Sequence, residues 1–488
     1  RPAEITSLVP SSIEIGSSIT LARGSRKKKP VVGLGAQGMN TDTQAWIGSG
    51  TKINEINGTA GANQSVLVAA GNDFFRLGIA GALAASGTVG VGVGADVAVM
   101  SHQTKAGIGN GALVNARRDV DVAARSSQEV LSISASLGAS GTVGVSGSVS
   151  VLSFDNETWA RIGDDASVDA GGNAAVLAQD DTDTTLIAGT VALGLGGGGI
   201  GGGVGVTTID KDTRAWIGSN AVVDARGQNT ADMPAYSGDT FAGTAAMRGL
   251  QVRAQSSEDL FTIAAAGAGG LYVGIAGAVS VAAIDSDTTA YIGDGAQINT
   301  SGGTANAAQD VNVTARNDLE MLTVAGALGV GAVGIAGAVD VGVIRNDTTA
   351  YIGNNASVNA ARDVDVNALS RKDIDTFVVS ASGGLAGIAA GVAVYSVGGA
   401  LDGDSRDRLK SDDGDTVGSY ADAQATDGSI AGSFLSGYSD SRIQSASANV
   451  SAARSGTGVS GRFTATETHT LPAGNAAFIG SGTTVSAG

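Results

Sequence analysis

The chain contains no cysteine, and it has only two histidines and five prolines among 488 residues. Without cysteine it can form neither a disulfide framework nor a thiolate metal site, so packing and hydrogen bonding must hold it together. Aromatic residues make up 4 % of the chain and charged residues 15 %, yet 43 % is hydrophobic, too much for a disordered segment. Glycine is abundant, at 76 residues, but it lacks the every-third spacing of collagen.

Basic residues are scarce as well. Lysine and arginine number 29 against 46 acidic residues, which gives a net charge of −17. A nucleic-acid partner needs a surface rich in lysine and arginine, so we expect none. The start, Arg1-Pro2-Ala3-Glu4, resembles no secretion signal, and we interpret both ends as those of a processed or excised piece.

One heptapeptide recurs along the chain. Residues 287–293 and 347–353 both read D-T-T-A-Y-I-G, and 212–218 and 42–48 read D-T-[R/Q]-A-W-I-G. Weaker copies lie at 103–109 and 157–163, and a half-copy, A-F-I-G, ends at Gly480. Most copies are 54 to 61 residues apart, which predicts a repeat protein with units of about 55–60 residues.

Strand patterns keep register with this heptapeptide. Twelve residues before its glycine, several units end an alternating run such as Val273, Ile275, Gly277, Val279 and Val281, and we expect these side chains to face inward. A later strand reads D-V-x-V-x-A, as at Val120, Val122 and Ala124. We expect roughly four short strands per unit, separated by glycine, asparagine or aspartate turns.

A single unit is too small to bury a core, whereas stacked units can do so. The pattern therefore predicts an all-β protein, a parallel β-solenoid with loop insertions, and we expect two or three coils per unit. The recurring threonines should form a ladder, and the aromatic position of the heptapeptide should face outward because Gly107 and Arg161 also occupy it. The threonines are Thr43, Thr104, Thr158, Thr213, Thr288 and Thr348.

The A-Y-I-G, D-V-x-V-x-A and V-G-x-x-G-x-V-x-V blocks resemble repeats of large secreted bacterial surface proteins. The nearest are the leukotoxin-type filamentous adhesins and, more loosely, the filamentous-haemagglutinin group exported by autotransporter or two-partner routes. The resemblance covers most of 31–400 and the final A-F-I-G. It implies a right-handed parallel β-helix, an extracellular location and a structural or adhesive role, and it supplies no active-site residues.

Departures from the repeat suggest a division of the chain. We predict a degenerate N-terminal unit at 1–40, solenoid repeats at 41–397 with an insert at 226–249, an insertion rich in serine, aspartate and glycine at 398–472, and a further repeat beginning at 473–488. A membrane helix at 263–284 is a weaker alternative, because its glycine content and its spacing of two favour strands.

Few residues suggest chemistry. His102 and His469 belong to no metal or catalytic motif, so we interpret both as turn or surface residues. The run from Gly194 to Gly205 lacks the lysine and serine of a phosphate loop, and we interpret it as a strand. An acidic stretch in the larger insertion could supply calcium ligands or could be a solvated loop. Its acids are Asp402, Asp404, Asp407, Asp412, Asp413 and Asp415.

We therefore expect a structural, non-enzymatic segment of an extracellular filament, with copies of itself as partners, head to tail or laterally. The first alternative is an adhesin stalk that binds a host surface or glycans without polymerising. The second is a β-helix enzyme that degrades polysaccharides, which the acids recurring once per unit disfavour. We expect no membrane insertion and no cofactor apart from the possible calcium.

Overall fold

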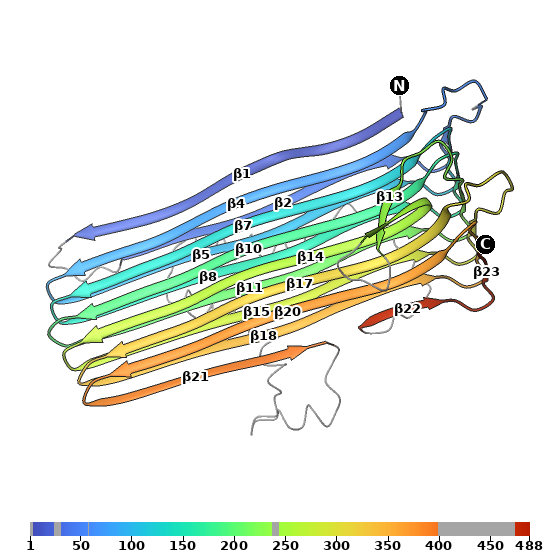
Figure 1. Ribbon diagram of the computed structural model, residues 1–488. Coiled ribbons are helices and arrows are strands. Elements are labelled where there is room, and N and C mark those ends of the chain that lie inside the picture. Colours follow the sequence, from blue (N-terminus) through green and yellow to red (C-terminus); the bar gives the residue numbers. More distant parts are fainter. Residues whose placement is uncertain (1–2, 24–30, 57, 237–243, 399–473) are drawn as a thin grey trace.

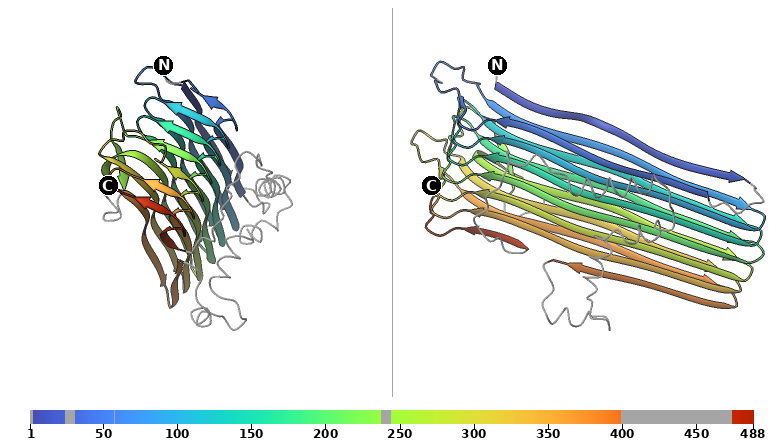
Figure 2. Two further views of the ribbon diagram at one scale, coloured as in Figure 1. Left: turned by 90° about the vertical axis from the view of Figure 1, so that its right-hand side faces the viewer. Right: turned by 180° about the vertical axis from the view of Figure 1, so that it is seen from behind.

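The computed structural model describes the chain except residues 1–2, 24–30, 57, 237–243 and 399–473 (Figure 1). It is a right-handed parallel β-helix built from three parallel sheets. Each repeat contributes one long strand to sheet A, one long strand to sheet B and one short strand to sheet C. The long sheets lie face to face, and sheet C closes the coils at one end (Figure 2).

The strand bounds follow one order in every coil. Sheet A consists of β1 (Ala3–Arg23), β4 (Val66–Ser86), β7 (Val120–Ser140), β10 (Ala174–Gly194), β14 (Thr244–Gly270), β17 (Gln309–Val330) and β20 (Val364–Gly383). Sheet B consists of β2 (Val31–Ile47), β5 (Val89–Ile108), β8 (Val143–Ile162), β11 (Gly198–Ile217), β15 (Val273–Ile292), β18 (Val333–Ile352), β21 (Ala386–Val397) and β22 (Asn475–Ile479). Sheet C consists of β3 (Lys52–Ile53), β6 (Leu113–Ala116), β9 (Ser167–Ala170), β12 (Val222–Ala225), β16 (Gln297–Ile298), β19 (Ser357–Asn359) and β23 (Thr484–Ser486).

The solenoid prediction is confirmed, but each repeat forms one coil and not two or three. Val120 pairs with Val66 on one side and with Ala174 on the other, so neighbouring coils are one repeat apart in sequence. The expected four short strands are also wrong. The strands β7 and β8 have 21 and 20 residues, far longer than the five or six that are usual, and they use up the repeat within one turn.

The heptapeptide forms the corner between sheets B and C. Its isoleucine ends the sheet B strand, and its glycine lies against the coil before, where a Cβ on Gly109 would stand 2.5 Å from the nitrogen of Ser49. Two residues later the backbone is left-handed in every copy, a conformation that favours glycine, asparagine and aspartate. These residues are Gly50, Gly111, Asp165, Asn220, Gly295, Asn355 and Gly482.

The interior beside sheet C is apolar. The D-V-x-V-x-A strands turn Val120, Val122 and Ala124 into it, where they meet Ile292 and Ile298 and their copies from other coils. The recurring threonines of the heptapeptide pair with one another from coil to coil and form the predicted ladder. Each lies on the interior face, two residues before the buried alanine of the heptapeptide, and all of them are buried. Thr158 donates a 2.6 Å hydrogen bond to Asp180, while the other hydroxyls of the row have no partner within the described residues.

Further along the long strands the predicted orientation is reversed. The alternating row that includes Val273 and Ile275 faces outward, whereas Gly274, Ala276 and Ala278 face the interior. Small residues are required there because the two long sheets approach closely: a Cβ on Gly144 of sheet B would lie 2.3 Å from the carbonyl oxygen of Leu193 in sheet A. The larger side chains therefore point away from this thin core.

The pairing departs from the regular coil at two places. In the first, β13 (Met233–Tyr236) pairs antiparallel with the start of β14. In the second, β21 and β22 both pair with β18, so Val397 lies opposite Ile344 and Asn475 opposite Thr348, with the insertion between them. Residues 263–270 end β14 and residues 273–284 begin β15, with a two-residue connection between them, and no helix in the described part of the chain could span a membrane.

A glycine pair in β11 tests the thin core. A Cβ at Gly199 would lie 2.4 Å from the carbonyl oxygen of Ala192, whereas a Cβ at Gly202 would meet nothing within 4 Å. We expect Gly199→Ala to cost about 1–3 kcal/mol of stability through overpacking and to lower the melting temperature. The matched variant Gly202→Ala should leave the melting temperature unchanged or raise it. Equal effects would contradict the close approach of the sheets.

Candidate functional site

Strand alternation leaves every second side chain of sheet A on the outside. Three adjacent outer rows form an apolar groove that runs along the solenoid axis, across the strands. One wall consists of Ile79, Ile133, Ile187, Ile263, Val324 and Phe377. The floor consists of Gly81, Ala135, Gly189, Ala265, Gly326 and Val379. The other wall consists of Leu83, Leu137, Val191 and Leu328, with Gly267 and Ala381 in the same row.

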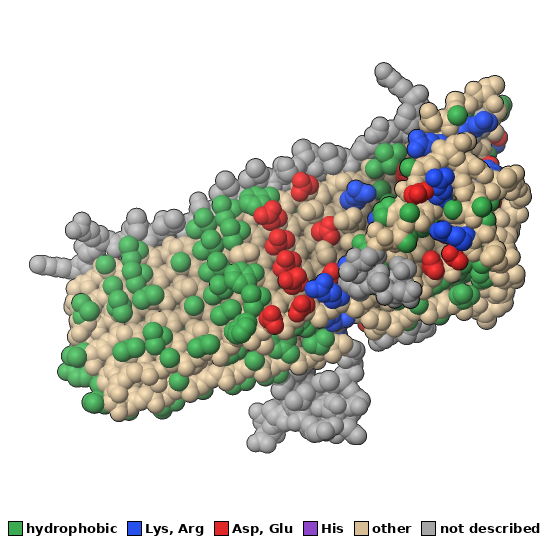
Figure 3. Space-filling view, in the orientation of Figure 1, with side chains coloured by type: hydrophobic (Ala, Val, Ile, Leu, Met, Phe, Trp, Pro, Cys, Tyr) green, Lys and Arg blue, Asp and Glu red, His purple; other side chains and the backbone are tan. Residues whose placement is uncertain are grey.

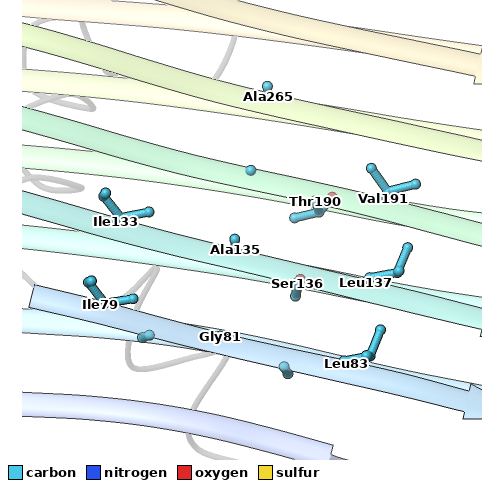
Figure 4. A pocket seen from close by; sticks show the side chains of 13 residues that line it. Ile79, Gly81, Leu83, Ile133, Ala135, Ser136, Leu137, Thr190, Val191 and Ala265 are labelled. Carbon is cyan, nitrogen blue, oxygen red and sulfur yellow. The ribbon is translucent and has the colours of Figure 1, made fainter. Parts of the chain in front are cut away.

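The side chains of this outer groove are accessible. A hollow of about 600 Å³ lies between Ile79 and Ile133 on one side and Leu83, Leu137 and Val191 on the other (Figure 4). Leu83 is 38 % exposed and Val191 44 %. Walls four residues apart on a strand are about 13 Å apart, a width that admits a single row of aliphatic side chains. The groove suits an elongated apolar partner better than a compact polar one.

A column of acidic side chains borders the outer groove on the side of sheet C (Figure 3). Neighbouring members are one strand spacing, about 4.8 Å, apart, so their charges repel. Burial raises the pKa of Asp183, with Glu129 adding to the effect, and burial and Asp183 raise the pKa of Asp259. The column consists of Glu129, Asp183, Asp259, Glu320 and Asp373.

Sheet B carries two acidic rows on its own outer face. One contains Asp155, Asp210 and Asp285, and the other contains Glu157, Asp212, Asp287 and Asp347. Burial and neighbouring carboxylates raise the pKa of Asp287 to about 7 and that of Asp210 to about 6. Within the described residues, no group of three or more acidic or histidine side chains is arranged to hold a metal ion.

The aromatic position of the heptapeptide builds a further outer row on sheet B. Trp216, Tyr291, Tyr351 and Phe478 stack in succession, with ring centroids 4.8 to 6.0 Å apart. The row faces outward as predicted, yet Tyr351 is only 1 % exposed because neighbouring rings cover its faces. Gly107 and Arg161 occupy the aromatic position in two coils. The guanidinium carbon of Arg161 lies over the rings of Trp46 and Trp216, 5.3 and 5.8 Å from their centroids.

The histidine prediction is wrong for His102. Its side chain points inward from β5 and is 1 % exposed, and Nδ1 is 2.6 Å from the hydroxyl of Thr41. Burial lowers the pKa of His102 to about 4, so the ring is neutral at pH 7. The run Gly194–Gly205 contains the last residue of β10, a turn and the first part of β11, in keeping with the strand interpretation. His469 and the calcium hypothesis at residues 402–415 lie outside the described residues.

Comparisons of the chain with protein-family models, curated proteins and solved structures found no match. The candidate site therefore depends on geometry alone. The outer groove was not expected from the sequence, because alternating apolar rows such as Val273 and Ile275 were predicted to face inward. A usable signal was present: in the second halves of β4 and β7, from Leu77 to Ala85 and from Leu131 to Ala139, both alternating faces are apolar or small, which indicates two packed surfaces and not one.

The acidic rows predict a pH dependence. Folding raises the pKa of Asp287 from 3.8 to about 7, so between these values the folded state binds protons more tightly than the unfolded chain. The contribution of Asp287 to stability therefore falls as pH rises toward about 7 and changes little above it. We expect Asp287→Asn to raise the melting temperature near pH 8 and to change it less near pH 4.5. An equal change at both pH values would contradict the shifted titration.

Proposed function

We propose that this chain is a structural repeat segment of a secreted bacterial surface protein, and that copies associate side by side through the outer groove into fibres or matrix. The observation that carries the proposal is the repetition of ridge, groove and ridge once per coil on sheet A. Support for the extracellular bacterial location comes from the resemblance of the repeats to secreted adhesins.

A second copy is the occupant that fits this surface best. The ridge formed by Ile79, Ile133 and Ile187 has the shape that the glycine and alanine floor of the same groove accepts, so the surface is self-complementary. Each coil adds one side chain to the ridge and one to the floor of the groove, at the strand spacing. Two solenoids can therefore interlock over several coils at once. Each buried aliphatic side chain would contribute about 1.5–3 kcal/mol, enough in total to offset the entropy of association.

The acidic column beside the groove sets the conditions for assembly. Two copies brought together would add the negative charges of Glu129 and Asp183 to those of the partner surface. Association should therefore strengthen as salt screens the charges or as protonation removes them.

Charged substitutions in the groove test the proposal. We expect Ile133→Lys combined with Leu137→Lys to abolish fibres in negative-stain images and to leave a monomer in sedimentation, since a buried ammonium is costly. The control Ser127→Lys lies on the same strand and outer face, between Asp73 and Asp181, and should assemble normally. All variants should keep the β-sheet circular dichroism of the parent, because these side chains lie outside the coils.

The outcomes also separate the alternatives. A monomeric parent chain that binds cells or glycans would favour a non-polymerising adhesin stalk and would overturn side-by-side assembly. Release of unsaturated sugars from a polysaccharide would favour the enzyme. Fibres that persist in the doubly substituted chain would show that assembly uses another surface.

A further inference from the structure

A lysine is completely enclosed in the solenoid interior. Lys211 extends inward from β11, and its side chain is 0 % exposed. Its Nζ lies 2.9 Å from Oδ1 of Asp180 on β10 and 3.1 Å from Oε1 of Glu258 on β14, and these carboxylates are 1 % and 0 % exposed. Nζ also donates to the backbone oxygens of Asp180 and Ser257, at 3.1 and 3.0 Å. One amine and two carboxyl groups thus meet where water is excluded.

Burial makes a net charge on this triad costly. Two ionised carboxylates around one ammonium would leave a buried net negative charge, which is expensive, so a neutral triad carries one protonated carboxyl group. Burial lowers the pKa of Lys211, but the charges and hydrogen bonds of Asp180 and Glu258 raise it by more. A neutral triad of this kind consists of an ammonium, a carboxylate and a carboxylic acid. Transfer of one proton from Nζ to the carboxylate gives a neutral amine beside two carboxylic acids.

The two carboxyl groups are held differently. Oδ2 of Asp180 accepts a 2.6 Å hydrogen bond from Thr158, which leaves Oδ1 toward the amine. Glu258 is fixed by Ser256 and Ser286, whose hydroxyls donate to Oε1 at 2.5 and 2.9 Å. Asp180 thus presents a polarised carboxyl carbon to Nζ, with its second oxygen already hydrogen-bonded. Glu258 contacts the same nitrogen through Oε1 and is placed to carry protons.

We propose that Lys211 and Asp180 condense into an intramolecular amide, with Glu258 as the proton carrier. Nζ, as the neutral amine, attacks Cγ of protonated Asp180, and a C–N bond forms while Thr158 supports the negative charge that develops on Oδ2. Glu258 donates its proton to Oδ1 and takes one from Nζ. The C–Oδ1 bond breaks, and one water leaves. An ammonium and a carboxylate become an amide and a water, so atoms and charge balance, and no oxidant or cofactor is required.

Position and burial both favour this reaction. Since Oδ1 is bonded to Cγ, the distance from Nζ to Cγ is at most about 4 Å, and the scaffold holds the two groups together in the manner of an intramolecular reaction. The product is neutral, so it removes the cost of keeping an ion pair in the interior. The amide would join β10 of sheet A to β11 of sheet B within one coil and would resist pulling that separates the long sheets.

Intact mass spectrometry of the full, denatured chain tests the crosslink. We expect the parent chain to be lighter than its sequence mass by one molecule of water, and Lys211→Arg and Glu258→Gln to have their full masses. The control Lys105→Arg, which alters an ion pair with Glu157 on the outer face of sheet B, should still lack one water. Digestion should yield one branched peptide that contains residues 180 and 211.

Asp180→Asn identifies the attacked carbon. An asparagine at this position releases ammonia in place of water, so the variant should be lighter than its own sequence mass by one ammonia. A parent chain with its full sequence mass, folded by circular dichroism, overturns the proposal, and loss of water from Asp180→Asn overturns the choice of Asp180. Because the readout is covalent mass, it does not depend on whether the chain assembles into fibres, and circular dichroism of each variant shows whether a full mass comes from a folded chain.

Discussion

The close approach of the two long sheets is the constraint on which the rest of the structure depends. A Cβ on Gly199 would stand 2.4 Å from a carbonyl oxygen of the opposite sheet, so only glycine fits there, and nearby inward positions hold small residues such as Ala276 and Ser146. A core this thin contributes little hydrophobic free energy, so the stack relies on long hydrogen-bonded strands and on the thicker apolar region beside sheet C. Long strands compensate for the thin core, because each strand of about 20 residues adds many ladder hydrogen bonds per coil.

The thin core also explains the surface. Large aliphatic side chains excluded from the interior stand on the outer faces, where they form the groove that we propose as the assembly surface. Between the apolar region and the thin region the interior is wide enough for polar side chains, and it contains Arg76 paired with Asp96 at 2.8 Å as well as the Lys211 triad. The interior thus contains buried charges beside its apolar clusters, and the outer faces carry apolar rows beside acidic ones.

Periodicity made part of this architecture predictable. A left-handed backbone favours glycine, asparagine or aspartate at the corner of each coil, as at Gly295, and the spacing of these residues gives the coil length. Val120 and Val122 mark the apolar core. Orientation could not be predicted where both faces of a strand are apolar or small, as in β15, because alternation gives the period but not the inward side. The Lys211 triad could not be predicted either, since its members come from three strands and only the coil register brings them together.

Thiol labelling at two neighbouring positions tests the inverted packing most directly, and the absence of natural cysteine makes the experiment clean. In β8 the side chain of Val145 lies on the outer face, while Ser146 is 3 % exposed and lies 2.8 Å from Ser136 of the opposite sheet. In the native protein we predict fast labelling of Val145→Cys and protection of Ser146→Cys, with equal rates after denaturation. Protection of Val145→Cys and fast labelling of Ser146→Cys would place the valine rows in the core and contradict the account.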